Sequence, residues 1–146
     1  MDVNQFSILH VEDDLVDSMV VERILKKQNI CSVLYKAKNG VEALSMLRGN
    51  SHQPIETPDI ILLDLNMPKM NGLEFLKELR GDDNLKTINV FVLTTSDDET
   101  DKQLAYKYNV AGYLLKPINA MEFENVFTVL KDFWTLSVKR AQGNIE

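Results

Sequence analysis

Short apolar segments alternate with segments of helical periodicity along most of the chain. The apolar segments that we predict to be strands are Phe6–Val11, Cys31–Ala37, Asp59–Leu63, Asn89–Thr94 and Gly112–Leu115. Three of them are nearly continuous in aliphatic and β-branched residues. Continuous runs of this kind are typical of strands buried on both faces, as in a parallel sheet.

The segments between these strands carry apolar residues at helical spacing. The residues that mark the first three helices are Val16, Met19, Val20 and Ile24, then Val41, Leu44 and Leu47, then Leu73, Phe75, Leu76 and Leu79. A fourth helix, around Asp101–Tyr108, is weakly amphipathic, and a fifth begins near Ala120. Asn71 and Asn119 are each followed three residues later by a glutamate, a pattern similar to a capping box.

The alternation gives the order (βα)5 and predicts an α/β fold. We expect a doubly wound, five-stranded parallel sheet with helices on both faces. Ligands of such folds bind outside the carboxyl ends of the strands. The chain has 146 residues, of which 45% are hydrophobic, and this suits one domain over residues 1–146. Gly49–Pro58 is expected to be a long loop within it.

Polar side chains follow several strands at their carboxyl ends. Glu12–Asp14 follow the first strand, Asp64 the third, Thr94–Ser96 end the fourth, and Lys116–Pro117 follow the fifth. Because these ends share one edge of a parallel sheet, the side chains are expected to gather in one shallow cleft.

The loop after the third strand has two residues with special backbone properties. Pro68 fixes the φ angle in the loop after Asp64. Gly72 is expected to allow unusual backbone angles near the start of the next helix.

The chemistry of this edge points to phosphoryl transfer. Crowded carboxylates need a cation, and oxygen ligands without His or Cys favour Mg²⁺, with Mn²⁺ as a substitute. Asp64 is then a candidate carboxylate nucleophile that forms an aspartyl phosphate. Lys116 and Thr94 are candidates to hold phosphoryl oxygens.

Four motifs carry a family resemblance. VEDD, DLNMPKMNG, LTTS and YLLKP, in this order, resemble the response-regulator receiver domain of two-component signalling, over roughly Phe6–Leu130. The strings LTTS and KDFW are also similar to the single-domain subfamily that serves bacteriophytochrome-type histidine kinases. The resemblance implies a flavodoxin-like receiver fold.

The resemblance also implies roles for the acidic residues. Asp64 matches the phosphoacceptor, Asp13 a direct metal ligand, and Glu12 a ligand acting through water. Asn66 would give its backbone carbonyl to the metal. Asp14 is an extra acid, so the register of the acidic pair is open to a shift by one residue.

Other matched positions concern the response to phosphate. Thr94 and Lys116 match the hydroxyl and the lysine of the family site. Tyr113 matches an aromatic switch that moves when Thr94 is drawn to the phosphoryl group. The Lys116–Pro117 bond matches a cis peptide.

The composition limits the partners of the chain. A net charge of −6 and a pI near 4.9 argue against nucleic acid or an anionic membrane as the main partner. Neither a signal peptide nor a membrane span is apparent in the sequence. Cys31 is the only cysteine, so an internal disulfide is excluded and a reducing cytoplasm is expected. His10 is expected to be a hydrogen-bonded core residue, and His52 is assigned no role.

These features predict a phosphorylation-dependent signalling switch rather than an enzyme. A sensor histidine kinase would donate its phosphoryl group to Asp64, and the protein would promote only its own phosphotransfer and autodephosphorylation. We expect no output domain, because one receiver-like domain takes up the 146 residues to Glu146. We therefore expect a downstream protein, a phosphotransfer partner or a homodimer to carry the signal.

Two other functions are weighed against the switch. A phosphohydrolase of the haloacid-dehalogenase-like kind also forms an aspartyl phosphate. Such enzymes need a second acid two residues after the nucleophile, where this chain has Asn66. A receiver-like interaction module that is never phosphorylated is the other alternative, and the complete set of site residues argues against it.

The predicted fifth helix continues past the sheet, with residues 131–146 as a helical extension. A helix from Ala120 to Lys139 would be ~30 Å long, whereas a strand of about five residues spans ~17–20 Å. Phe133 and Trp134 are expected to form a homodimer contact, because aromatic residues are enriched at interfaces. In the alternative, both fold back over the core of their own chain.

Overall fold

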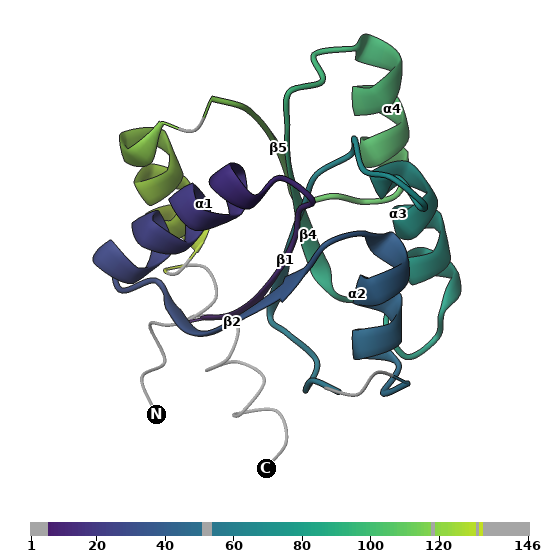
Figure 1. Cartoon of the computed structure of the whole chain (residues 1–146). Coiled ribbons are helices and arrows are strands. Elements are labelled where there is room, and N and C mark those ends of the chain that lie inside the picture. Colours follow the sequence, from purple (N-terminus) through teal and green to yellow (C-terminus); the bar gives the residue numbers. More distant parts are fainter. Residues whose placement is uncertain (1–5, 51–53, 118, 131, 133–146) are drawn as a thin grey trace.

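Five parallel strands form one sheet with helices on both faces (Figure 1). The computed structural model describes residues 6–50, 54–117, 119–130 and 132. The strands are β1 (Phe6–Val11), β2 (Cys31–Ala37), β3 (Ile60–Leu63), β4 (Asn89–Thr94) and β5 (Gly112–Leu115). The helices are α1 (Leu15–Lys27), α2 (Gly40–Leu47), α3 (Gly72–Gly81) and α4 (Glu99–Lys107), followed by a C-terminal helical segment over residues 120–130. The predicted alternation of strands and helices is confirmed.

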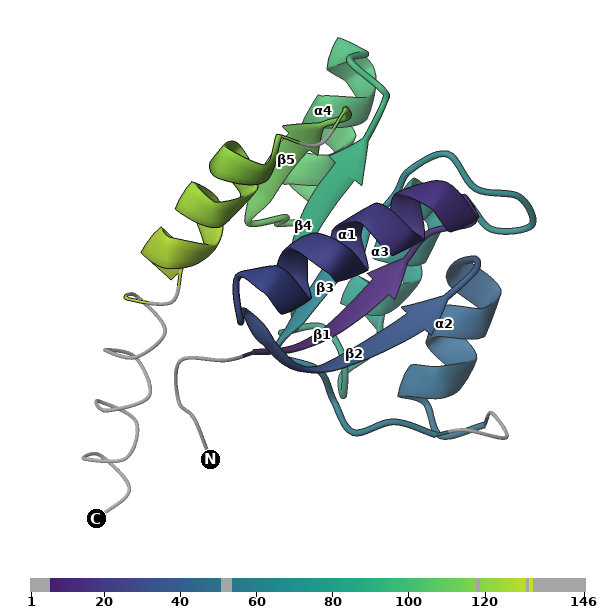
Figure 2. The same cartoon turned by 60° about the vertical axis from the view of Figure 1, so that its left-hand side comes forward.

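The strand order brings the polar strand ends together. Along the sheet the order is β2-β1-β3-β4-β5, and every neighbouring pair is parallel. The strand arrows therefore run toward the same edge of the sheet (Figure 2). Val11 pairs with Leu63, which are the last residues of β1 and β3, and Leu63 also pairs with Val92 of β4. The residues that follow β1 and β3 consequently leave the sheet side by side.

The core consists of two hydrophobic clusters, one on each face of the sheet. Helices α2, α3 and α4 cover one face, where Leu44 and Phe75 are buried. Helix α1 and the C-terminal helical segment cover the other, where Leu25 and Phe127 are buried. All four residues of β3, Ile60–Leu63, are 0% exposed, as predicted for a strand covered on both faces.

The third strand begins at Ile60, one residue later than predicted, and the preceding residue, Asp59, is hydrogen-bonded to Ser7. Its carboxylate accepts hydrogen bonds from the Ser7 N–H at 2.9 Å and from the Ser7 hydroxyl at 3.2 Å. The Asp59 N–H in turn donates to the Ser7 carbonyl at 2.9 Å. These bonds hold the starts of β1 and β3 together.

Helix α1 lies where its apolar spacing predicted, but much of that apolar stripe faces outward. Val16 and Met19 are 67% and 56% exposed, whereas the residues buried under the helix are Ser18, Val21 and Leu25. Apolar residues occur around most of this helix, so their spacing fits more than one face. The burial of α1 depends on how it follows β1, which periodicity alone does not encode.

The C-terminal helical segment packs through its aromatic residues. Phe123 and Phe127 are each 2% exposed, and their ring centroids lie 4.9 Å apart. Phe127 also lies 6.3 Å from the rings of Phe6 and Phe91. Neither this segment nor any other described helix is long and apolar enough to cross a membrane.

The structure does not test the homodimer contact that the sequence predicts for the C-terminal extension. Phe133, Trp134 and the helical extension over residues 131–146 lie outside the described residues, apart from residue 132, which is helical.

The asparagine caps predicted from the sequence are present. The Asn71 side chain accepts the Glu74 N–H at 2.9 Å, and the Glu74 carboxylate accepts the Asn71 N–H at 3.2 Å, which completes a capping box. Asn119 accepts the N–H groups of Met121 and Glu122. Both asparagines therefore satisfy backbone donors at a helix start.

Arg80, near the end of α3, ties two connections together. Its guanidinium donates to the carbonyls of Lys86 and Ile88, both at 2.8 Å, in the connection from α3 to β4. It also donates to the carbonyls of Tyr108 at 2.7 Å and Asn109 at 3.1 Å, in the turn after α4. The burial that accompanies these bonds lowers the pKa of Arg80, and the four carbonyls satisfy four of its five N–H donors in a fixed geometry.

Gly72 begins α3 close to the backbone that follows β3. A Cβ atom at residue 72 would lie 2.5 Å from the Asp64 carbonyl oxygen and 2.7 Å from the Leu65 Cα atom. The expectation that Gly72 supplies an unusual backbone angle is wrong, because the positive φ of this loop belongs to Lys69, at 66°. Glycine is required at residue 72 by the close approach of two backbone segments.

We predict that Gly72→Ala lowers the free energy of unfolding by about 1–3 kcal/mol, the usual cost of adding atoms to a packed site. The clash involves backbone atoms, so rotation of a side chain cannot relieve it. Urea unfolding followed by circular dichroism measures the change. Gly81→Ala is the matched control in the same helix, because an added Cβ there meets nothing within 4 Å. Equal losses in the two variants would contradict the prediction.

Candidate functional site

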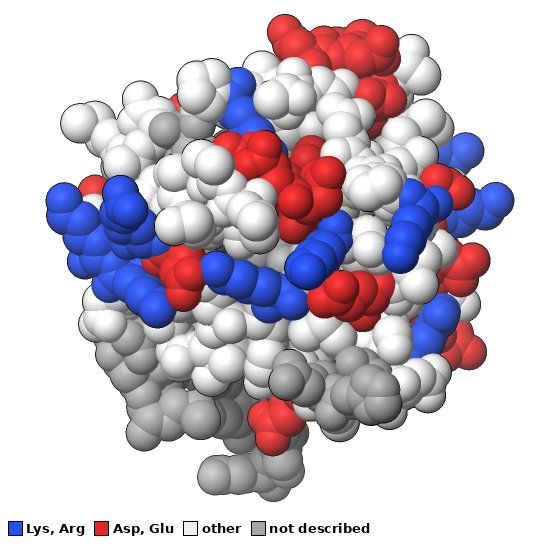
Figure 3. Space-filling view, viewed as in Figure 1, with Lys and Arg blue, Asp and Glu red and all other residues white. Residues whose placement is uncertain are grey.

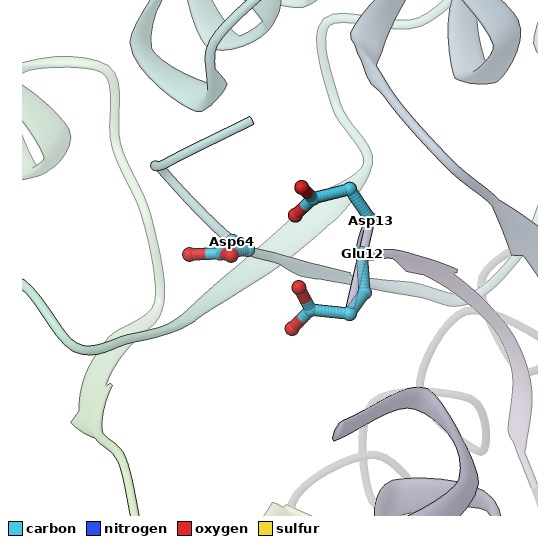
Figure 4. Close-up of side chains that lie close together, drawn as sticks. All are labelled: Glu12, Asp13 and Asp64. Carbon is cyan, nitrogen blue, oxygen red and sulfur yellow. The ribbon is translucent and has the colours of Figure 1, made fainter. Parts of the chain in front are cut away.

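Three carboxylates meet beyond the ends of β1 and β3. Glu12 and Asp13 follow β1, Asp64 follows β3, and oxygen atoms of all three lie within 4.8 Å of one another. Figure 4 shows the three side chains together at the strand ends. The parallel pairing of Val11 with Leu63 explains the meeting, because the next residue of each strand leaves the sheet at the same place. Carboxylates this close repel one another unless a cation lies near them.

The three acids differ in their access to solvent. Glu12 and Asp64 are each 5% exposed, whereas Asp13 is exposed. An open cavity of about 450 Å³ lies beside Asp13, and its lining includes Asn66, Pro68 and Asp101. In Figure 3, acidic side chains gather on the surface over the end of β1 and the start of α1. The site is therefore a shallow acidic opening with a buried floor.

The donor set of this cluster suits a hard divalent cation. It consists of carboxylate oxygens, and Mg²⁺ and Mn²⁺ prefer such ligands while retaining bound waters. Asn66, whose backbone carbonyl the sequence suggested as a further ligand, lies in the loop that lines the cavity. The residues present therefore fit the cation that the sequence predicts.

Lys116 reaches into the acidic cluster from the end of β5. Its ammonium lies 2.5 Å from Glu12 Oε1, 2.7 Å from Asp17 Oδ2 and 3.6 Å from Asp64 Oδ2. Burial alone would lower the pKa of Lys116, but its hydrogen bonds to Asp17 and Glu12 and the charge of Asp64 raise it above its ordinary value. The Lys116–Pro117 peptide bond is cis, as the family resemblance implied.

Asp17 was not identified in the sequence as a site residue. It lies in the first turn of α1, where an acid is usual at a helix start and carries no functional signal by itself. The only available signal was its spacing, one helical turn after Asp14 and close behind the acidic pair. Its contact with Lys116 depends on how α1 lies against β5.

Glu12 has an unusual electrostatic environment. The pKa of Glu12 is raised to about 7. Burial is the main cause and the charge of Asp64 adds to it, whereas the hydrogen bond from Lys116 opposes the rise. A carboxyl group with this pKa is partly protonated near neutral pH. A divalent cation in the cluster would favour its ionised form.

Thr94 and Tyr113 meet at the same backbone segment. Thr94, which is 0% exposed at the end of β4, accepts the Ser96 N–H on its hydroxyl oxygen at 3.3 Å. The Tyr113 hydroxyl donates to the Ser96 carbonyl at 2.8 Å. The Ser96 hydroxyl in turn donates to the Asp101 carboxylate at 2.6 Å. Ser96, to which the sequence analysis gave no role, thus links these two residues to the start of α4.

His10 is buried in β1, two residues before Glu12. The expectation that it is a hydrogen-bonded core residue is wrong, since no described residue bonds either ring nitrogen. Burial, assisted by the charges of Lys116 and Lys36 and opposed by that of Asp64, lowers its pKa to about 4. His10 is therefore neutral at physiological pH.

Comparisons with known proteins agree with this geometry. Residues 8–128 match the family described as the response regulator receiver domain. The chain is 36% identical over 132 residues to response regulator Rcp1 of Synechocystis sp. (strain ATCC 27184 / PCC 6803 / Kazusa), covering 90% of each chain.

Two solved structures show the same fold. The Mn²⁺-bound form of response regulator Rcp1 is 37% identical, with a TM-score of 0.72, and the match covers 87% of this chain and 92% of that one. The bacteriophytochrome response regulator AtBRR is 32% identical, with a TM-score of 0.72, and the match covers 90% of this chain and 93% of that one.

We predict that His10 makes stability depend on pH. Its folded pKa lies below the ordinary value of 6.5, so the unfolded chain binds the proton first as pH falls. Its contribution is complete above about pH 6.5 and is lost as pH falls to about 4, a change of about 3 kcal/mol. His10→Leu should remove this loss, as measured by urea unfolding in EDTA between pH 7 and 4.

The comparison between the two proteins isolates this contribution. Glu12, whose folded pKa is raised, acts in the opposite direction and stabilises the fold as pH falls from about 7. Glu12 is present in both proteins, so its effect cancels in the difference. Parallel pH profiles for wild type and His10→Leu would refute the assignment.

Proposed function

The chain belongs to the response regulator receiver family, and we propose that it is a phosphorylation-dependent switch that accepts a phosphoryl group on Asp64. One observation carries this proposal: Glu12, Asp13 and Lys116 gather around Asp64 at a single edge of the sheet. A sensor histidine kinase is the proposed donor. The similarity to response regulators, including one described as a bacteriophytochrome response regulator, supports that choice.

Asp64 is the proposed nucleophile. One of its carboxylate oxygens attacks the phosphorus of a phosphohistidine, so that a P–O bond forms and the P–N bond breaks. The imidazole nitrogen keeps the electron pair of the broken bond and takes a proton from solvent. The backbone N–H of Asn66 donates to Asp64 Oδ1 at 3.2 Å, which orients the carboxylate. Because the Asp64 carboxylate is buried, a phosphoryl donor can reach it only from the open side of the site.

Glu12, Asp13 and Asp64, with the backbone carbonyl of Asn66, are the residues proposed to hold Mg²⁺ or, in its place, Mn²⁺. Asp13 would bind directly and Glu12 through water. When bound, such a cation neutralises charge on the transferring phosphoryl oxygens. The Mn²⁺-bound structure of Rcp1 supports a divalent cation in a related protein.

Thr94, Lys116 and Tyr113 are proposed to convert phosphorylation into a change of surface. The phosphoryl group brings a charge of about −1.5 to −2, which attracts Lys116 and the Thr94 hydroxyl. When that hydroxyl turns away from the Ser96 N–H, the Ser96 segment loses one of its contacts and Tyr113 moves with it. The surface formed by α4, β5 and the C-terminal helical segment then changes its preferred partner.

The output of this switch is proposed to be another protein. A downstream protein or a phosphotransfer partner would read the surface, and a homodimer through Phe133 and Trp134 is a further proposal. The proposed setting is the cytoplasm. Autodephosphorylation at Asp64 would reset the switch, so the protein is not proposed to act on other substrates.

The alternative functions receive less support. A phosphohydrolase would need an acid two residues after Asp64, and the amide of Asn66 cannot transfer a proton in that role. An interaction module that is never phosphorylated has no need for an acidic cluster with a buried lysine. The presence of both features argues for phosphorylation.

We predict that Asp64 is the sole phosphorylation site. Incubation with acetyl phosphate and Mg²⁺ should add one labile phosphoryl group to the wild type, detected by intact-protein mass spectrometry. Asp64→Asn should add none, because an amide is a poor nucleophile. Asp83→Asn is the control for loss of one carboxylate, since the Asp83 side chain is 93% exposed. A labile phosphoryl group on Asp64→Asn at the wild-type rate would refute the assignment.

We also predict that Mg²⁺ binding depends on Asp13 and not on Asp14. Asp13 belongs to the carboxylate cluster, whereas the Asp14 side chain accepts the Asp17 N–H at 3.0 Å as the cap of α1. Asp13→Asn should weaken Mg²⁺ binding at least ~10-fold, since even indirect changes to metal sites have effects of that size. Asp14→Asn keeps a good capping residue and should bind as wild type in calorimetric titrations. Equal losses would show that the register of the acidic pair is shifted.

A further inference from the structure

Lys116 has a carboxylate partner that lies outside the proposed metal cluster. Its ammonium lies 2.7 Å from Asp17 Oδ2, closer than the 3.6 Å to Asp64 Oδ2. The carboxylates that could hold a metal among the described residues are those of Glu12, Asp13 and Asp64, and Asp17 is not one of them. The contact between Asp17 and Lys116 is therefore an ion pair at the side of the site.

The start of α1 holds Asp17 in this place. Asp14 caps the helix, and its carboxylate accepts the Asp17 N–H at 3.0 Å. Asp17 consequently lies in the first helical turn, directly after the residues that end β1. Its side chain is 35% exposed, whereas that of Lys116 is 7% exposed. Asp17 thus meets the lysine from the solvent side of the site.

We propose that Asp17 is a positioning residue, which holds Lys116 in a resting position and competes with the phosphoryl group on Asp64 for the lysine ammonium. This inference rests on the function proposed above and assigns the control of Lys116 to a named residue. In the resting protein the ammonium is shared mainly between Glu12 and Asp17. In the phosphorylated protein it must turn to a phosphoryl oxygen beside Asp64.

The chemistry of the two resting partners shows which of them can release the lysine. An ammonium has three donors, so the number of donors does not decide which carboxylate it leaves, and the surroundings of the two carboxylates decide it instead. Glu12 is buried beside Asp64 and belongs to the metal cluster. Asp17 is half-exposed, so water can replace its bond to the lysine at small cost. Asp17 is therefore the partner that Lys116 leaves.

The electrostatics of Lys116 agree with this assignment. Burial by itself would lower its pKa, and the hydrogen bonds to Asp17 and Glu12 and the charge of Asp64 together raise it. Lys116 is therefore charged in the resting protein. The competition concerns where the charge lies and not whether it exists.

The test is the affinity for beryllofluoride, a phosphoryl mimic, in the presence of Mg²⁺. We expect Asp17→Asn to bind beryllofluoride more tightly than wild type by roughly three- to tenfold, the size expected when one competing charge-assisted hydrogen bond is removed. Calorimetric titration of the full chain measures the affinity. An unchanged or weaker affinity would overturn the proposal, because a purely structural role of Asp17 predicts no tightening.

Two controls separate the competition from a general loss of negative charge. Glu42→Gln removes an acid from the same position in the first turn of α2, on the other face of the sheet, and should leave the affinity unchanged. In a protein that already carries Lys116→Met, Asp17→Asn should no longer tighten binding. Tightening that persists without Lys116 would place the effect elsewhere and overturn the proposal.

A second measurement does not require phosphorylation chemistry. In NMR spectra of ¹⁵N-labelled protein without added ligand, the Lys116 ammonium should give a slowly exchanging signal in wild type and a faster exchanging one in Asp17→Asn. An identical signal in both would show that Asp17 does not hold Lys116. A wild type with the slow signal but no beryllofluoride binding would overturn the proposed function and the competition, while leaving the contact itself intact.

Discussion

One problem of charge balance governs the functional edge of this protein. The parallel pairing of β1 with β3 forces the carboxylates of Glu12, Asp13 and Asp64 into one place, where they repel one another. The Lys116 ammonium follows the end of β5 and lies against this cluster, where its positive charge offsets the repulsion between the carboxylates. The hydrophobic clusters on both faces of the sheet keep the strands in the register that this arrangement needs. Packing thus fixes the geometry, and electrostatics determines what the geometry can bind.

Most of the fold could be predicted from local patterns, because apolar runs and helical periodicity are properties of neighbouring residues. The positions of Asp64 and Lys116 could also be predicted, since parallel strands deliver their carboxyl ends to one edge. The outward-facing residues of α1, such as Val16 and Met19, could not. Their orientation depends on how a helix with apolar residues on several sides settles on the sheet.

The remaining differences arise from contacts between distant segments. No described residue bonds the ring nitrogens of His10, because β1 is buried on both faces, and its own sequence does not reveal this. Gly72 is constrained by the backbone of Asp64 and Leu65 rather than by its own φ angle. Asp17 resembles any acid in a first helical turn until Lys116 is placed beside it. Each of these features requires knowledge of two elements together.

The bonds of Arg80 have a mechanical consequence for α4. They fix the carbonyls of Tyr108 and Asn109, just past the C-terminal end of that helix, to the end of α3. The N-terminal end of α4 follows the Ser96 segment, which is held by the side chains of Thr94, Tyr113 and Asp101. Because the bonds of Arg80 hold the C-terminal end of α4 to α3, a movement of the helix would be a rotation about that end. A small displacement at Ser96 would tilt the helix instead of sliding it, and the largest excursion would fall at the end farthest from Arg80.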